Sequence, residues 1–171
     1  AEVKGLAPAS CYTYQLALDA GAKGRFCTAR RPGDTFRFLA IGDTNPTLGD
    51  NTTNILKNVV PTNFDFTIHG GDVEYYASTL ETWAGWFPLM APLLRQGALE
   101  TSIGNHELEK PDELEAYTLR YFAKSGLDAN ANTYYRFTSG GVWFFALDTE
   151  QSFGPNSAQA DWLVKGLADA S

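Results

Sequence analysis

Basic residues are scarce in this sequence, and long hydrophobic runs are absent. Lys and Arg number 13 against 20 Asp and Glu, the formal net charge is −7, and Arg30-Arg31 is the only basic pair. A face that binds nucleic acid needs clustered Lys and Arg, so we expect no nucleic-acid partner. The longest apolar run, Val142 to Leu147, is far shorter than the roughly 18 residues of a membrane span, so we expect no membrane partner either.

An initiator methionine and a signal segment are also missing. The chain begins at Ala1, and no basic stretch followed by an apolar one comes after it. We therefore expect either a processed protein or a part of a longer one. The 171 residues, 44% of them apolar, suffice for about one domain with a hydrophobic core.

Cysteine occurs only twice, as Cys11 and Cys27. Alternating residues over 11–18 predict a strand with one buried face, and turn-forming residues predict a hairpin centred near Gly21 to Gly24. With that centre Cys11 lies opposite about position 32, whereas bridged cysteines need Cα atoms within about 7 Å. A disulfide then requires a shifted turn or a bulge, so we favour unbridged cysteines and leave the redox compartment open.

Beyond Arg31-Pro32-Gly33-Asp34 the pattern changes to strands that alternate with helices, which is typical of an α/β fold. Pro88 and Pro92 are expected to break or kink one of the helices. We predict strands at 36–41, 64–69 and 99–103, helices at 50–60, 79–94, 111–126 and 157–168, and a hairpin of 134–137 with 142–147.

Three of the predicted strands run into a glycine and then a polar side chain. The stretches are Ile41-Gly42-Asp43, Gly70-Gly71-Asp72 with Tyr75 beyond it, and Gly104-Asn105-His106-Glu107. Strand ends that share one edge of an open α/β sheet are where such folds bind ligands. Taken singly, each aspartate is more often a turn former or a helix cap, and the tyrosine or histidine a surface side chain.

Taken together, these residues supply the ligand atoms of a metal site. Hard cations prefer carboxylate, phenolate and amide oxygens, which Asp43, Asp72, Tyr75 and Asn105 provide. A bridging carboxylate holds two cations about 3.5 to 4 Å apart, and such a pair clamps a phosphate group and brings the pKa of a bound water to about 7. His106 then stands where it can give a proton to the leaving oxygen.

The three motifs resemble the first three signature motifs of the metallophosphoesterases, and specifically of the purple acid phosphatases. Ordinary metallophosphoesterases carry a histidine two residues after the first aspartate, where this chain has Asn45. Purple acid phosphatases use the tyrosine of the second motif instead, which matches Tyr75. Gly104-Asn105-His106-Glu107 is the most specific of the three motifs.

The resemblance implies a role for each motif residue. Asp43 and Tyr75 would bind Fe(III), Asp72 would bridge, and Asn105 would hold a second divalent metal such as Fe, Zn or Mn. His106 would be the proton donor or a phosphate contact, with Glu107 orienting it. His69 receives no role from the motifs, and we interpret it as a structural residue of its strand.

The resemblance also implies a fold and two incomplete domains. Residues 33–171 would form the N-terminal half of a metallophosphoesterase α/β/β/α sandwich. Residues 1–32 resemble the tyrosine-corner region and last strands of a fibronectin type III domain, which needs about seven strands to cover its faces. Plant and bacterial purple acid phosphatases carry such a domain there, and the family implies a secreted or periplasmic protein.

Histidine is the residue that the family needs and this sequence lacks. Three further histidine ligands are required, whereas the chain has only His69 and His106. Four oxygen ligands do not close the shells of two metals. We therefore expect a chain truncated at both ends and inactive alone, whose missing C-terminal half supplies the histidines and the second sheet. The expected substrate is a small phosphate ester, and the alternatives are a catalytically dead binding or structural module, or a metallophosphoesterase acting on diesters or nucleotides.

Overall fold

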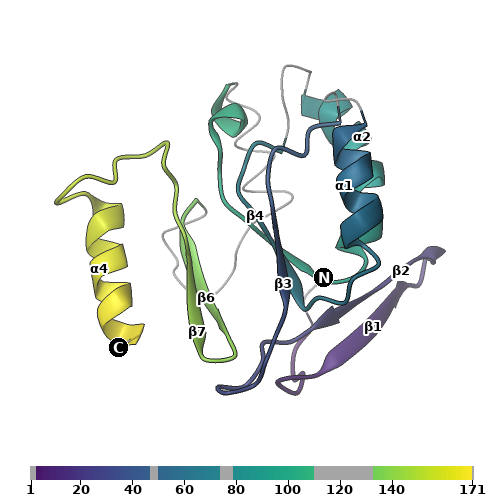
Figure 1. The fold of residues 1–171 in the computed structure, drawn as a ribbon, viewed down its shortest axis with the longest axis horizontal. Coiled ribbons are helices and arrows are strands. Elements are labelled where there is room, and N and C mark those ends of the chain that lie inside the picture. Colours follow the sequence, from purple (N-terminus) through teal and green to yellow (C-terminus); the bar gives the residue numbers. More distant parts are fainter. Residues whose placement is uncertain (1–2, 47–49, 74–78, 110–132, 171) are drawn as a thin grey trace.

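The structure, a computed structural model, describes residues 3–46, 50–73, 79–109 and 133–170. Two sheets lie face to face between helices, so the layers run α/β/β/α (Figure 1). This arrangement confirms the predicted fold class. The predicted helix at 111–126 lies outside the described residues, and no described helix has the length and apolar character to cross a membrane.

The first sheet is parallel and has the order β3-β4-β5, and helices α1 and α2 cover one of its faces. Its opposite face meets the antiparallel pair β6-β7, whose outer face is covered by α4. The second sheet thus begins within this chain, and the expectation that it comes entirely from elsewhere is wrong. The elements are β3 (Phe38–Ile41), α1 (Asn51–Val59), β4 (Phe66–His69), α2 (Thr79–Leu94), β5 (Ala98–Thr101), the short 3-10 helix η1 (Asn105–Leu108), β6 (Tyr135–Ser139), β7 (Val142–Ala146) and α4 (Ala158–Ala170).

The core on the helix side depends on α2. Trp83, Trp86, Met90 and Leu93 recur at helical spacing, and all four are buried against residues of α1 and of the strand-end loops. The helix has the predicted bounds and runs through Pro88 and Pro92 without a break. Both prolines are exposed, and water can therefore bond the carbonyl groups that their missing N–H donors leave without a helical partner.

Phenylalanine rings fill the space between the two sheets. Phe66 of β4 lies 5.4 Å from Phe137 of β6 and 5.5 Å from Phe144 of β7, measured between ring centroids. Phe38 of β3 lies 5.5 Å from Phe144 in the same way. Side chains at alternate positions of a strand point to the same face of its sheet, so these rings all lie in the layer between the two sheets.

The N-terminal hairpin consists of β1 (Cys11–Leu16) and β2 (Asp19–Cys27). Its register places Cys11 opposite Cys27, and the two sulfurs form a disulfide. The preference for unbridged cysteines is therefore wrong, because the chain turns between Leu16 and Asp19 rather than near Gly21 to Gly24. An irregularity of the register at Gln15 and Leu16 supplies the bulge that a bridge was expected to need.

The apolar side chains of β1 are not covered as the alternation predicted. Tyr14 is 40% exposed, Leu16 57% and Leu18, in the turn, 103%, so the expectation of one buried face is wrong for the described residues. The hydroxyl of Tyr12 accepts a hydrogen bond of 2.9 Å from the Ala7 N–H, a bond of the tyrosine-corner kind. The fibronectin-like domain at 1–32 and the catalytic domain at 33–171 remain predictions.

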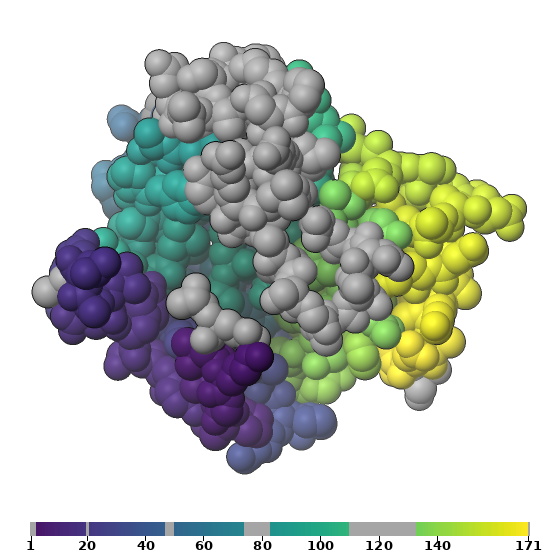
Figure 2. Space-filling model, turned by 180° about the vertical axis from the view of Figure 1, so that it is seen from behind, coloured from purple at the N-terminus to yellow at the C-terminus, as the bar shows by residue number. Residues whose placement is uncertain are grey.

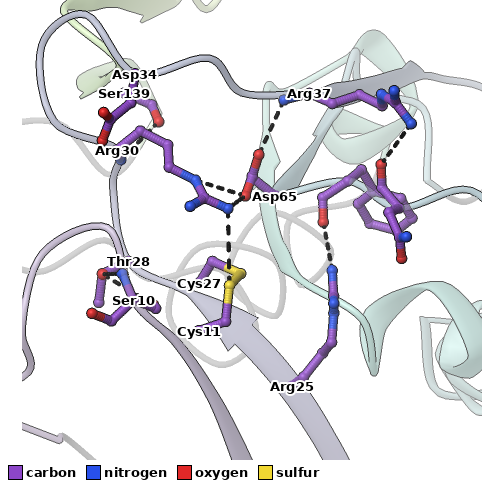
Figure 3. A network of polar contacts seen from close by, with 12 residues as sticks. Ser10, Cys11, Arg25, Cys27, Thr28, Arg30, Asp34, Arg37, Asp65 and Ser139 are labelled. Atoms are coloured by element: carbon purple, nitrogen blue, oxygen red, sulfur yellow. Dashed lines mark hydrogen bonds and ion pairs between the residues drawn. A yellow bond between two sulfur atoms is a disulfide. The ribbon is translucent and has the colours of Figure 1, made fainter.

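Arg30 and Asp65 join this hairpin to both sheets (Figure 3). The guanidinium group of Arg30, just after β2, forms an ion pair with Asp65, just before β4. The other carboxylate oxygen of Asp65 accepts a hydrogen bond from the Arg37 N–H at 3.0 Å. The Arg30 N–H donates to the Ser139 hydroxyl at 3.2 Å, and the Arg30 carbonyl accepts a hydrogen bond from the Gly140 N–H at 3.0 Å. Arg30 therefore joins the N-terminal hairpin to the parallel sheet and to the antiparallel pair.

Candidate metal centre

The loops that follow β3, β4 and β5 lie at one edge of the parallel sheet, where the carboxyl ends of the strands meet. Asp43 has φ +52° and Asp72 has φ +57°, so both occupy the left-handed region. This region costs a residue with a Cβ atom roughly 1–3 kcal/mol, and such residues gather at functional sites. Two aspartates held this way at adjacent strand ends support a functional role for this edge.

Glycines let the three loops touch through their backbones. The Gly70 N–H donates to the Ile41 carbonyl at 2.8 Å, and the Asp43 N–H donates to the Gly71 carbonyl at 3.3 Å. A Cβ atom on Gly71 would lie 2.5 Å from the Gly104 nitrogen, and one on Gly104 would overlap the Asp72 carboxylate. Gly71 and Gly104 are therefore required for the close approach itself.

The buried carboxylate of Glu107 holds two of these loops together. Its Oε2 accepts hydrogen bonds from the N–H groups of Asp72 at 3.0 Å and Gly104 at 2.7 Å, and its Oε1 accepts one from the Val73 N–H at 2.6 Å. Burial raises the pKa of Glu107, and the three N–H donors oppose that rise. The family resemblance implied that Glu107 orients His106, whereas these hydrogen bonds fix the backbone around Asp72.

His106 contacts Asp72 through its backbone. Its N–H donates to Asp72 Oδ1 at 3.2 Å, and its Nδ1 lies 2.7 Å from Glu109 Oε1. Asn105 begins the 3-10 helix η1 and is exposed, while the side chain of His106 is 12% exposed. The edge therefore carries Asp43, Asp72, Asn105 and His106, whereas Tyr75 lies outside the described residues.

A second buried network lies directly behind Asp43. Thr44 Oγ1 accepts a hydrogen bond from Trp86 Nε1 at 2.9 Å and lies 2.7 Å from His69 Nε2. Because the Gly71 N–H donates to His69 Nδ1 at 3.2 Å, the ring proton of a neutral His69 is on Nε2, which donates to Thr44. Burial lowers the pKa of His69 to about 4, which keeps the ring neutral.

This network agrees with the interpretation of His69 as a structural residue, but Thr44 and Trp86 were not among the predicted site residues. The sequence contains only weak signals that these two residues support the site. Thr44 directly follows a candidate ligand, and Trp86 belongs to an apolar helix. Asn45, at the position where ordinary metallophosphoesterases carry histidine, is completely buried.

The donor set suits a hard cation. Asp43, Asp72 and Asn105 offer carboxylate and amide oxygens at one sheet edge, and the two aspartates hold unfavourable backbone conformations there. Elsewhere in the described ranges, ligand atoms of Cys11, Cys27 and Asp65 lie within 4.8 Å of one another. The two cysteines are bridged, so that group has no thiolate to offer a metal.

A four-layer α/β fold with acidic strand-end loops defines a phosphoesterase-like class of protein. Residues 36–166 match the family model of the calcineurin-like phosphoesterases, and the chain belongs to that family. This match confirms the resemblance that the three motifs indicated.

Two curated relatives are purple acid phosphatases of Arabidopsis thaliana. "Probable purple acid phosphatase 20" is 31% identical over 148 residues, which cover 81% of this chain and 34% of that protein. "Purple acid phosphatase 22" is 26% identical over 156 residues, covering 86% of this chain and 36% of that protein. The chain thus spans about a third of the length of these relatives.

A solved structure shares the fold. The purple acid phosphatase PPD1 from yellow lupin (Lupinus luteus) seeds superimposes with a TM-score of 0.77 at 20% identity. The alignment covers 97% of this chain and 35% of the lupin chain. This likeness confirms the mixed α/β architecture across nearly all of the residues.

Proposed function

We propose that this chain contributes half of the dinuclear metal centre of a purple-acid-phosphatase-type enzyme that hydrolyses phosphate esters. The observation that carries the proposal is the environment of Asp72. Its backbone is in the left-handed region, its N–H is held by Glu107, and its Oδ1 accepts the His106 N–H. A carboxylate fixed from two directions is preorganised to bridge two cations.

The proposed roles follow the motifs. Asp43 and Tyr75 would hold Fe(III), Asp72 would be shared by the two ions, and Asn105 would hold a divalent Fe, Zn or Mn. When bound, these ions supply a nucleophile at neutral pH and neutralise the charge of the phosphate group. His106 donates a proton to the leaving oxygen, and Glu107 keeps Asp72 and Gly104 in position.

The chain offers too few ligands for two metals, so the proposed enzyme is inactive without histidines from another part of the protein. The family membership and the coverage of about a third of each curated relative support this requirement. The C-terminal half of the catalytic domain is thus the first proposed partner.

The remaining partners and the compartment are also proposals. A small phosphate ester is the substrate, and neither nucleic acid nor a membrane is a partner, as the charge of −7 and the short apolar runs suggest. The disulfide supports a secreted or periplasmic location, because disulfides persist in oxidising compartments.

Metal analysis and a visible spectrum of the full-length protein test the proposal. We expect bound iron and a tyrosinate-to-iron band that Tyr75→Phe abolishes. Asp72→Ala should lose both metals, whereas His106→Ala should keep them and lower kcat by roughly 10²- to 10⁴-fold. A colourless protein with divalent ions only would favour a general metallophosphoesterase, and one without metal would favour a non-catalytic module.

A further inference from the structure

A cleft of about 600 Å³ lies between the N-terminal hairpin and the end of the sheet where β4 and β5 begin. Figure 2 shows the hairpin, in purple, lying against the teal α/β part. The hairpin contributes Tyr14, Lys23 and Arg25 to the cleft, and the α/β part contributes Asn63, Arg95 and Gln96. The cleft is thus at the opposite end of the strands from Asp72 and Asn105, and the four-residue strands between them are about 13 Å long.

Hydrogen bonds fix the walls of this cleft. The Arg25 N–H donates to the Arg95 carbonyl at 2.8 Å, and the Arg25 guanidinium donates to the carbonyls of Gln96 and Phe64, both at 3.0 Å. A Cβ atom on Gly24 would lie 2.5 Å from the Tyr14 hydroxyl and 2.8 Å from the Arg95 carbonyl. A larger residue at position 24 would press on the Arg95 carbonyl, so Gly24 permits the close contact between the hairpin and the α/β part at this wall of the cleft.

The charge of the cleft is opposite to that of the whole chain. Among the lining residues that the structure describes, the charged ones are Lys23, Arg25 and Arg95, all basic, whereas the sequence as a whole carries −7. Arg25 uses two of its guanidinium N–H groups on the two carbonyls, and others remain to donate. Within the described ranges, neither Lys23 nor Arg95 forms an ion pair through its side chain.

We propose that this cleft binds a small organic phosphate. Two guanidinium groups and one ammonium group belong to the lining residues, and such groups suit a dianion because both donate charge-assisted hydrogen bonds to phosphate oxygens. The volume lies in the range of small-molecule sites, which leaves room for an organic body beside the Tyr14 ring and the amide of Asn63. This site is separate from the candidate metal centre and does not depend on the proposed hydrolysis.

Calorimetric titration of the full-length protein with phenylphosphonate tests the proposal, because its carbon–phosphorus bond resists hydrolysis. The titration is run before and after metals are removed by chelation, so that binding at the metal centre is separated from binding in the cleft. We expect one site that persists after chelation. Arg95→Gln and Lys23→Gln should each raise its Kd about tenfold, the loss of one charge-assisted hydrogen bond.

Lys165→Gln, on the exposed side of α4, is the matched control and should leave the Kd unchanged. Arg95→Gln keeps the backbone carbonyl that holds the hairpin, so it tests the charge without removing that bond. The proposal is overturned if no site persists after chelation, or if Arg95→Gln binds as tightly as Lys165→Gln. Binding of heparin but not of phenylphosphonate would contradict the small ligand and indicate an anionic polymer instead. A full-length protein that contains no metal would contradict only the proposed hydrolysis.

Discussion

Thr44 illustrates how one hydroxyl group supports the loop beside the candidate metal centre. It is 5% exposed and accepts hydrogen bonds from Trp86 and His69. Thr44→Val keeps the shape but leaves two buried N–H groups without an acceptor, so we expect the free energy of unfolding to fall by about 2–4 kcal/mol. Urea unfolding of the full-length, metal-depleted protein measures this change.

Thr44→Ser is the control for that substitution, because it removes only a methyl group and keeps the acceptor. The serine variant should lose less than half as much stability as the valine variant. Equal losses in both variants would show that packing of the methyl group, rather than the hydroxyl, matters at this position.

His69 makes stability depend on pH. Burial lowers its pKa from 6.5 to about 4, so between these values the unfolded chain binds a proton that the folded chain does not. Stability is therefore lost as the pH falls through this window, by up to roughly 3 kcal/mol. The pKa of Glu107 is raised, which acts with the opposite sign as the pH rises above 4.5.

His69→Asn separates the two contributions. Asn keeps an acceptor for the Gly71 N–H but does not titrate, so the difference between wild type and variant removes the part due to Glu107. Urea unfolding from pH 4 to pH 7 should give a shallower pH dependence for the variant. Parallel curves would contradict the assignment of this dependence to His69.

At the residue scale, the sequence predicted the position of the candidate ligands at one sheet edge, but it did not predict the residues that support them. Asp43, Asp72 and Asn105 follow apolar strands directly, and parallel strands bring such positions to one edge. The contact of Thr44 with Trp86 joins residues 42 positions apart, and no local pattern indicates which buried hydroxyl meets which indole.

Among the elements, the N-terminal hairpin offers the clearest test. The disulfide closes a loop with a sequence separation of 16 residues, for which loop entropy predicts a contribution of about 3 kcal/mol. We expect the double substitution Cys11→Ser and Cys27→Ser to lower the free energy of unfolding by up to that amount. The measurement is urea unfolding of both proteins with and without dithiothreitol, and only wild type should respond to the reductant.

The turn of the N-terminal hairpin was predicted at the wrong place, whereas helix α2 has the predicted bounds. The observed turn contains Leu18, which is apolar although it is fully exposed, so the sequence did not indicate a turn there. The glycines of β2 are typical turn residues, and they led to the prediction of a turn near Gly21 to Gly24. Pro88 and Pro92, which were expected to break or kink α2, do not interrupt it, and both lie on its solvent side. A residue type indicates which backbone conformation is preferred. The environment of the side chain in the folded protein decides whether the chain adopts that conformation.

At the scale of the whole molecule, the Arg30–Asp65 ion pair couples the hairpin to both sheets. Asp65→Asn leaves the partly buried guanidinium of Arg30 without its carboxylate, and we expect a loss of roughly 1–3 kcal/mol. Hydrogen exchange should show faster exchange in β1–β2 and in β6–β7 together. Faster exchange confined to the residues next to Asp65 would contradict this coupling.

The four-layer arrangement was predicted in outline. Alternating strands and helices indicate a parallel sheet covered by helices, and Phe66, Phe137 and Phe144 fill the space between the two sheets. The sequence did not indicate that 135–146 already starts the second sheet, because a hairpin pattern does not say which face it meets. That pairing depends on ring contacts across 71 or more positions.

The contact between Gly71 and Gly104 restricts how these loops can change during evolution. A Cβ atom on Gly71 would overlap the backbone of Gly104, and one on Gly104 would overlap Asp72, so a larger residue at either position displaces a neighbouring loop. Libraries that randomise both positions should return mostly the parental pair. The two sites are expected to tolerate less variation than the buried apolar residues around them, which have several side chains of similar volume to choose from.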